Sequence, residues 1–238
     1  MLRRNFINIK TKNIVKFYLN NNLIKKSIND PQETLLDFLR INQNLKGTKE
    51  GCAEGDCGAC TILIGKLDKD NKVIYKTANS CILFLPSIDN SHLITIDGLS
   101  NSLENLHPIQ EAFVKFSGAQ CGFCTPGIIM SALALLRKNN YPTKKEVEFA
   151  LSGVLCRCTG YQKIVNAVMN VNKISENLEE ISKNEKEVGK RIQRIDGEKK
   201  LDGTEIFGDD FSPENSLMIK VLRSPFNKAA FTIGDYKE

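Results

Sequence analysis

Eight cysteines are the residues of this 238-residue chain best suited to chemistry, and they fall into two groups of four. The first group has the spacing C-x4-C-x2-C, followed after residues 61–80 by a fourth cysteine. The second joins a C-x2-C pair to a C-x-C pair across residues 125–155. The first group is Cys52, Cys57, Cys60 and Cys81, and the second is Cys121, Cys124, Cys156 and Cys158. Cysteine thiolates bind zinc and iron–sulfur clusters, so the pattern predicts metal binding.

The spacing of the first group is typical of a plant-type [2Fe–2S] cluster. Its sequence, GCAEGDCGAC, also concentrates glycine between the cysteines. A cluster with four thiolates is negatively charged, so its loop must turn N–H groups toward the sulfurs, in conformations that glycine adopts most easily. We therefore expect Gly51, Gly55 and Gly58 to allow the backbone to approach the cluster. Zinc is the main alternative, although structural zinc sites usually combine two short C-x2–4-C pairs.

The second group alone leaves zinc and iron–sulfur binding open. Its C-x2-C pair lies at the start of one predicted helix and its C-x-C pair lies just before another. In an extended segment residues i and i+2 point the same way, so Cys156 and Cys158 can face one metal centre. The presence of the first group favours iron.

Composition and charge exclude several classes of protein. The net charge is +5, from 33 basic and 28 acidic residues that are interleaved, unlike the dense basic stripe of a nucleic-acid surface. The most apolar run, residues 127–136, is far shorter than the roughly 18 residues that span a bilayer. The N-terminus lacks the apolar run of a signal peptide. We expect a cytoplasmic protein that binds neither nucleic acid nor membrane, and whose thiols do not persist as disulfides.

The first third of the chain has the apolar period of strands. Partly alternating runs predict five strands, and NNN between the first two predicts a hairpin. Asp30, Pro31 and Glu33 have the order of an N-cap, a first helical residue and a capping box, which predicts a helix over 30–41. The predicted strands are residues 13–19, 23–28, 61–65, 72–78 and 93–96. Residues 4–98 thus indicate an α+β domain with a mixed sheet around the first cysteine group.

From residue 106 the apolar period changes to 3.6, which predicts helices. Pro108 and Pro126 stand where helices are expected to begin, and Thr143 with Glu146 has the spacing of a capping box. The predicted helices are residues 107–116, 126–138, 143–153 and 160–171. Residues 104–172 therefore indicate a four-helix bundle that carries the second cysteine group.

The remainder of the chain differs in composition from both domains. Residues 173–188 are rich in Lys, Glu and Asn and indicate a charged linker. Residues 189–238 contain the strand-like LMIKVL but too little apolar surface to close a core alone. They are predicted to be an incomplete α/β segment of a larger domain.

Five segments together resemble the iron–sulfur portion of the molybdenum hydroxylases, the family of xanthine dehydrogenase and aldehyde oxidoreductase. They are GTKEGCAEGDCGACTILIG, NSCILFLPS, LHPIQEAFV, GAQCGFCTPGIIMSALALL and SGVLCRCTGYQKIVNAV, in this order and with both cysteine spacings intact. The resemblance covers about residues 5–172. Residues 189–238 resemble the start of the molybdopterin-binding domain of the same family. GTKEGCAEGDCGACT and CILFLPS resemble bacterial xanthine dehydrogenases more than aldehyde enzymes.

The resemblance implies a β-grasp, ferredoxin-like [2Fe–2S] domain over 4–98 and an all-helical [2Fe–2S] domain over 104–172. Each cysteine group would hold one cluster, the helical one nearer the molybdenum. Gln120 matches the family position that contacts the pterin of the molybdenum cofactor; the alternative is an ordinary polar residue at a helix start. The implied partner is a molybdenum-binding catalytic domain or subunit, with an FAD subunit or a ferredoxin-type protein as electron acceptor.

Two departures from the family pattern affect this interpretation. Many xanthine dehydrogenases place a flavin domain after the helical domain, whereas only the charged linker intervenes here. The chain also ends before any substrate-binding or catalytic-base motif, so no catalytic residue is expected in it, and we expect a truncated chain or one part of a split gene. His92 and His107 belong to no base–nucleophile pattern and are expected to be ordinary residues.

The expected function is that of the electron-transfer component of an oxidoreductase. Single electrons would pass from the molybdenum cofactor through two [2Fe–2S] clusters to flavin or another acceptor. Two alternatives remain at this point. One is a zinc-bound interaction module that only scaffolds partners, and the other is a free-standing two-cluster ferredoxin.

Overall fold

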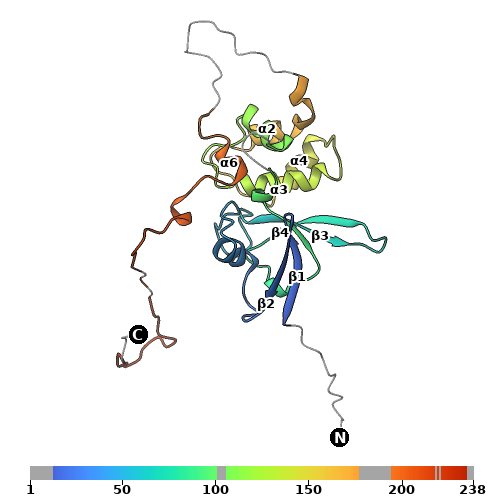
Figure 1. The fold of residues 1–238 in the computed structure, drawn as a ribbon. Helices are drawn as coiled ribbons and strands as arrows, with labels where there is room; N and C mark the ends of the chain where they lie inside the picture. The colour runs from blue at the N-terminus through green and yellow to red at the C-terminus, as the bar shows by residue number, and fades with distance from the viewer. Residues whose placement is uncertain (1–12, 101–105, 177–193, 218, 220, 235–238) are drawn as a thin grey trace, which may run out of the picture. The chain divides into compact units, whose positions relative to one another are not determined.

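The computed structural model describes residues 13–100, 106–176, 194–217, 219 and 221–234. The chain divides into a compact first unit that ends at Ile206 and a second unit that begins at Phe207. In its described residues the first unit contains one sheet and the helices α1 to α6 (Figure 1), and all eight cysteines lie in it. This is the mixed α+β class expected from the sequence.

The sheet has five strands in the order β2-β1-β5-β3-β4. The strands are β1 (Ile14–Leu19), β2 (Asn22–Ser27), β3 (Thr61–Leu67), β4 (Val73–Asn79) and β5 (His92–Ile94). Only the central β1–β5 pair is parallel; the other pairs are antiparallel. All five predicted strands are confirmed, and so is the first hairpin, whose two-residue turn begins at Asn20 with a positive φ of 53°.

The predicted helix start at Asp30 is wrong. The helix α1 (Leu35–Asp37) is capped by Thr34, whose hydroxyl accepts the Asp37 N–H at 3.1 Å, and it continues as a π-helix over Phe38–Asn42. Asp30 instead accepts the Gln32 N–H at 2.8 Å in a local turn. Tertiary pairing decides the difference, because Thr34 forms a β-bridge with Phe84 and so requires extended backbone just before the helix.

The four predicted helices of the second half are confirmed. They are α2 (Pro108–Lys115), α3 (Thr125–Leu136), α4 (Lys144–Leu151) and α5 (Gln162–Met169). The apolar helix α3 is buried along nearly its whole length, in contact with α2, α4 and the strand β3. A single core therefore runs from the helices into the sheet, where it includes Leu63 and Ile94. The capping box of Thr143 and Glu146 at α4 is also present.

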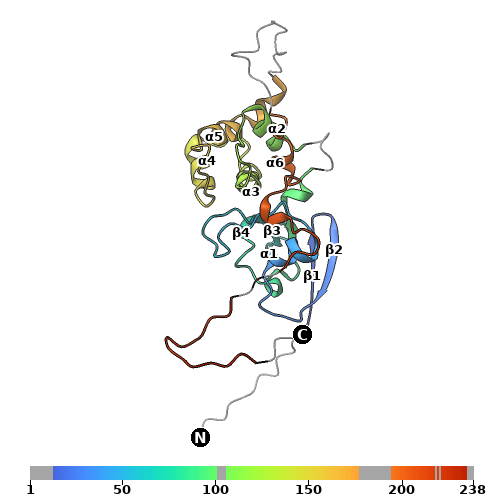
Figure 2. The same cartoon turned by 90° about the vertical axis from the view of Figure 1, so that its left-hand side faces the viewer.

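A short helix far along the chain packs among these four. The helix α6 (Lys199–Asp202) contacts α2 and α3, and its Leu201 is 1% exposed. Figure 2 shows it beside both helices. Composition predicts that these residues belong to a segment without a core of its own, whereas residues 194–206 lie in the first unit. Residues 177–193, which include most of the predicted linker, lie outside the described residues.

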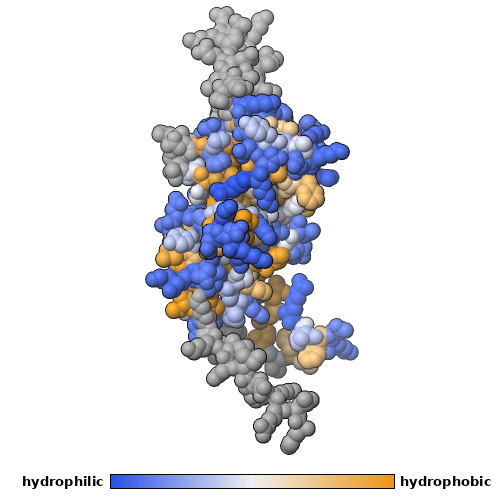
Figure 3. Space-filling model, turned by 90° about the vertical axis from the view of Figure 1, so that its right-hand side faces the viewer, coloured by the Kyte–Doolittle hydropathy of each residue, from blue (hydrophilic) through white to orange (hydrophobic). Residues whose placement is uncertain are grey.

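The second unit has little regular structure in its described residues. One 3-10 turn, Gly208–Asp210, is closed by the Asp210 carboxylate, which accepts the Phe207 N–H at 3.0 Å. Beyond it, apolar side chains such as Leu222, Phe226 and Phe231 are exposed. No helix in the described parts of the chain is long and apolar enough to span a bilayer. The face in Figure 3 is mostly hydrophilic, with its apolar side chains in separate groups.

Helix α2 begins at a histidine cap. The Nδ1 atom of His107 accepts the Ile109 N–H at 3.3 Å, and the Gln110 side chain accepts the His107 N–H at 2.8 Å. The cap therefore needs a neutral ring with a free Nδ1 lone pair. Burial, and next the positive charge of Arg137, lowers the pKa of His107, which favours that neutral form. His107 thus has a structural role.

We expect this cap to make stability depend on pH. Because the folded-state pKa of His107 lies below its ordinary value of 6.5, its stabilising effect is complete above pH 6.5 and is lost as pH falls toward the folded-state pKa. The loss should be at most about 1 kcal/mol, since the ring is half-buried and partly screened by water. Thermal midpoints at about pH 7.5 and about pH 5.5 measure it.

His107→Asn is the matched variant for this measurement. Asparagine is also a good N-cap, but its side chain does not titrate. Its thermal midpoint should therefore fall less on acidification than that of the wild type. Equal falls in the two proteins would show that another group controls the pH dependence.

Candidate metal centres

The first cysteine group is built on the loop between the π-helix and β3. Three backbone N–H groups, those of Glu54, Asp56 and Cys57, point at the Sγ atom of Cys52 from 3.3–3.5 Å. These hydrogen bonds, led by that of Cys57, lower the pKa of Cys52 to about 7. The loop thus presents a partial positive charge to a thiolate, as a cluster with excess negative charge requires.

The hairpin of β3 and β4 supplies the fourth member of this group. Cys60 directly precedes β3 and Cys81 lies two residues beyond β4, so the antiparallel register brings their Sγ atoms to 3.3 Å. The Ser80 hydroxyl donates to the Cys60 carbonyl at 2.8 Å and fixes this junction. Burial, and next the neighbouring Cys60 thiol, raises the pKa of Cys81 to about 12. A metal cation would replace that proton, because it stabilises the thiolate.

The three glycines of the loop have different neighbours. A Cβ added at Gly51 would lie 2.8 Å from the Cys57 sulfur, and one at Gly55, where φ is +82°, would lie 2.7 Å from Ile82. A Cβ at Gly58, where φ is +71°, would lie 2.1 Å from the carbonyl oxygen of Gly153. Gly58 therefore allows close contact with the helical part of the chain.

The second cysteine group gathers at the start of α3 and the segment before α5. The Sγ atoms of Cys121 and Cys158 are 3.7 Å apart. Cys124 and Cys156 are both buried, and their thiols contact each other. Burial, and next the Cys156 thiol, raises the pKa of Cys124. The structure thus brings all four predicted residues together.

Sequence reasoning missed the tyrosine that holds the C-x-C segment. The Tyr161 hydroxyl accepts the Cys156 N–H at 2.8 Å and donates to the Val154 carbonyl at 2.9 Å. Its backbone is left-handed, with φ of 64°, and its N–H bonds the Thr159 hydroxyl at 3.1 Å. The available signal was the short segment TGY directly after the second pair of cysteines.

The two cysteine loops meet backbone to backbone. The Leu155 N–H donates to the Cys57 carbonyl at 2.9 Å, and Leu155 is the residue before Cys156. Close contact is possible because Gly58 and Gly127 have no side chains: a Cβ at Gly127 would lie 2.3 Å from the Gly58 carbonyl oxygen. A backbone hydrogen bond therefore connects the two loops that carry the cysteine groups.

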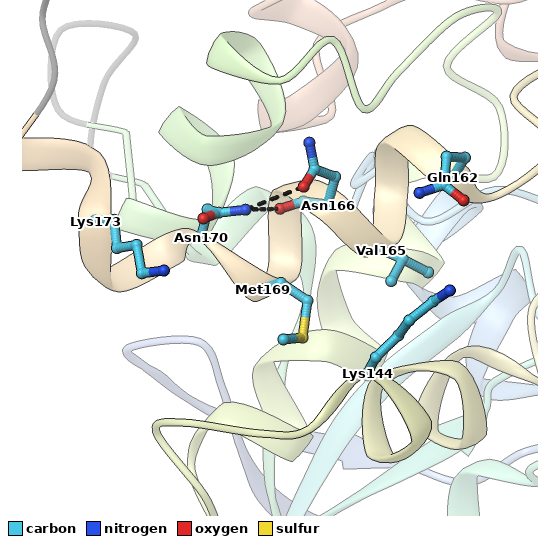
Figure 4. Close-up of a pocket in the computed structure, with 7 residues that line it drawn as sticks. All are labelled: Lys144, Gln162, Val165, Asn166, Met169, Asn170 and Lys173. Atoms are coloured by element: carbon cyan, nitrogen blue, oxygen red, sulfur yellow. Dashed lines mark hydrogen bonds between the residues drawn. The ribbon is translucent and has the colours of Figure 1, made fainter.

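The remaining singled-out residues lie outside these clusters of sulfur atoms. Gln120 is half-buried in the turn before Cys121. The His92 ring is held by the Tyr75 hydroxyl at 2.6 Å and the Asn20 carbonyl at 2.7 Å, which gives it a structural role. A surface pocket of about 300 Å³ between α4 and α5 (Figure 4) is lined by none of the cysteines.

The spacing of the sulfurs suits two-iron centres. Two thiolates on one tetrahedral metal with bonds of about 2.3 Å lie about 3.7 Å apart. In the first group the sulfurs of Cys60 and Cys81 lie 3.3 Å apart, and in the second those of Cys121 and Cys158 lie 3.7 Å apart. In the described residues no three Cys, His, Asp or Glu side chains are grouped as ligands of a single metal ion. Four thiolates arranged as two pairs fit a [2Fe–2S] rhomb, in which each iron takes two protein ligands.

Comparisons with known proteins agree with this chemistry. Residues 17–85 match the family model of a 2Fe-2S iron-sulfur cluster binding domain, and residues 95–169 match that of a [2Fe-2S] binding domain. The chain is 47% identical to xanthine dehydrogenase of Blastobotrys adeninivorans over 159 residues, which are 65% of this chain and 11% of that protein. It thus spans about a tenth of that relative.

Solved structures extend the likeness. The aldehyde oxidoreductase of Desulfovibrio desulfuricans ATCC 27774 matches 86% of this chain with 23% of its own, at a TM-score of 0.75 and 32% identity. A chain of quinoline 2-oxidoreductase from Pseudomonas putida 86 matches 69% of this chain with 96% of its own, at a TM-score of 0.57 and 32% identity. The iron–sulfur unit therefore occurs both inside longer chains and nearly alone.

The fold and both sites define an iron–sulfur electron-transfer protein with two [2Fe–2S] domains. The chain belongs to the molybdenum hydroxylases, the family of xanthine dehydrogenase and aldehyde oxidoreductase, and corresponds to their iron–sulfur part.

Proposed function

We propose that each pair of neighbouring sulfurs holds one iron. Cys52 with Cys57 and Cys60 with Cys81 would bind the first [2Fe–2S] cluster. Cys121 with Cys158 and Cys124 with Cys156 would bind the second. The sulfur–sulfur distances of 3.3 Å for Cys60 with Cys81 and 3.7 Å for Cys121 with Cys158 support this assignment. The N–H groups aimed at Cys52 support it as well.

The observation that carries the function is the hydrogen bond from Leu155 to Cys57. It joins the backbone of the proposed ligand Cys57 to Leu155, the residue before the proposed ligand Cys156. When bound, the clusters take up and release one electron at a time. The protein contributes rigid spacing, N–H donors and exclusion of water, which together set where an electron can pass and at what potential.

In the whole enzyme, the second centre would receive electrons from a molybdenum cofactor and the first would deliver them to an acceptor. Cys121 and Cys158 are the exposed members of their group, and the half-buried Gln120 precedes them, which supports contact of this side with the pterin. The acceptor would be an FAD subunit or a ferredoxin-type protein. The names of the relatives support a xanthine-like heterocycle or an aldehyde as substrate.

The domain assignment accompanies this function. Residues 4–98 would be the β-grasp ferredoxin-like domain, 104–172 the four-helix domain, 173–188 a linker and 189–238 the start of a molybdopterin-binding domain. The catalytic site would lie on the remainder of the enzyme or on a partner subunit. We place the protein in the cytoplasm, where thiols are kept reduced for cluster assembly.

Electron paramagnetic resonance of the anaerobically purified, reduced chain tests the proposal. We expect two distinct signals, each integrating to about one spin per chain, because each cluster takes one electron. A colourless, silent protein that contains zinc would instead identify an interaction module. Two signals without a molybdenum subunit in pulldowns from the host would favour a free-standing ferredoxin.

A further inference from the structure

Residues 194–206, here called the clasp, contact both cysteine-bearing parts of the first unit. The Gln110 side chain donates to the Leu201 carbonyl at 2.8 Å on the helical side. On the sheet side, the Lys49 ammonium donates to the Glu205 carbonyl at 3.1 Å. Gly203, with φ of +89°, comes so close to Gly47 that an added Cβ would lie 2.8 Å from its Cα. The clasp is therefore an integral part of the unit.

Within the clasp, Lys200 lies against the loop that joins Cys121 to Cys124. A Cβ added at Gly122 would lie 2.5–2.9 Å from the Cβ, Cγ and Cδ atoms of Lys200. Gly122 has φ of +93°, so this position already favours glycine. The lysine stem thus covers the turn between two proposed ligands and keeps water from that side of it.

Lys200 also brings a charge into a buried position. Its side chain is 6% exposed, and its ammonium pairs with the Asp196 carboxylate, which the Arg194 guanidinium also binds at 2.9 Å. Arg194 and Lys200 lower the pKa of Asp196, so the carboxylate is ionised. The three side chains carry a net charge of +1, and of the three Lys200 is the buried one, whereas Arg194 and Asp196 are 45% and 43% exposed. A charge away from bulk water acts more strongly on its neighbours than an exposed one.

We propose that Lys200 is a positioning residue for the second centre: its stem holds the Cys121–Cys124 loop closed and its charge favours the reduced form. This rests on the proposed ligand assignment. Reduction adds one negative charge to a cluster, and net charge and solvent exposure are the levers by which proteins set cluster potentials. Lys200 acts on both the net charge and the solvent exposure of the second centre, although it lies about 40 residues beyond the last cysteine.

Potentiometric titration of the cluster-loaded full chain, followed by electron paramagnetic resonance, tests the charge. Lys200→Met keeps an apolar stem and removes the ammonium. At a fixed solution potential it should lower the ratio of reduced to oxidised second centre about tenfold, or ~59 mV for one electron. Asp196→Asn should raise that ratio. The first centre should stay unchanged in both variants.

Lys199→Met is the matched control, because Lys199 is the exposed neighbour of Lys200 and loses the same formal charge. Its second-centre potential should match that of the wild type, since water and salt screen an exposed charge. Equal shifts of the second-centre potential in Lys199→Met and Lys200→Met would overturn the proposal. Equal shifts of the potentials of both centres in Lys200→Met would also overturn it. A wild type without cluster signals would refute the proposed function instead.

Amide hydrogen exchange tests whether the Lys200 stem holds the Cys121–Cys124 loop, without a redox measurement. Lys200→Ala removes the stem and should speed exchange over residues 119–125, whereas Lys200→Met should keep the protection of the wild type. If alanine and methionine variants exchange alike, the stem does not hold the loop.

Discussion

Cys124→Ala should abolish the paramagnetic signal of the second centre and leave that of the first. Cys124 is buried at the start of α3, in contact with Cys156, and it belongs to the core of the helices. Its removal leaves three thiolates where a [2Fe–2S] cluster needs four ligands. The first group keeps all its sulfurs and its N–H donors to Cys52, so we expect its spin count to stay near one per chain.

Cys81→Ala is the reciprocal variant. It should remove the first signal and spare the second, because Cys81 pairs with Cys60 and not with the helical group. Iron content should fall by about two atoms per chain in either variant, since each cluster holds two irons. Loss of both signals from either single substitution would mean that the centres do not assemble independently.

Gly58→Ala should separate the two cysteine loops. The new Cβ would lie 2.1 Å from the Gly153 carbonyl oxygen and 2.8 Å from the Val154 Cα, both backbone atoms that cannot rotate away. Left-handed backbone at residue 58 adds a cost of roughly 1–2 kcal/mol, and overpacking typically adds 1–3 kcal/mol. We therefore expect destabilisation by about 2–5 kcal/mol, together with weaker magnetic interaction between the centres.

Gly160→Ala separates the effect of left-handed backbone from the effect of a steric clash. Gly160 has φ of +60°, but an added Cβ there would meet nothing within 4 Å. This variant should be destabilised only by the cost of placing alanine in left-handed backbone, and it should keep the magnetic interaction between the centres. Thermal midpoints and power saturation of the two signals make the comparison. If the Gly58 and Gly160 variants behave alike, contact between the loops is not what couples the centres.

Local patterns predicted most of the fold because each strand and helix carries its own period and caps. Thr143 and Glu146 lie three residues apart, so their capping box is visible in the sequence. The Asp30 prediction failed for the opposite reason. Asp30 is as good a cap as Thr34, and the choice between them depends on Phe84, fifty residues away.

The metal centres likewise combine features that are local in the sequence with features that depend on contacts between distant segments. Spacing predicts all eight cysteines as cluster ligands, because such ligands follow a fixed pattern, but it gives no sign of which loops meet. The contact of Gly58 with Gly153 and the position of Lys200 over Gly122 depend on packing between distant segments. Composition also predicts a C-terminal segment without a core of its own. It gives no sign that Leu201 is buried, because that burial depends on helices far from it in sequence.

Chemical analysis of the anaerobically purified full chain tests the central claim most directly. Two four-cysteine [2Fe–2S] centres require about four irons and about four acid-labile sulfides per chain. We predict both values, in a red-brown protein with no stoichiometric zinc. A fully folded sample containing neither iron nor inorganic sulfide would contradict the account.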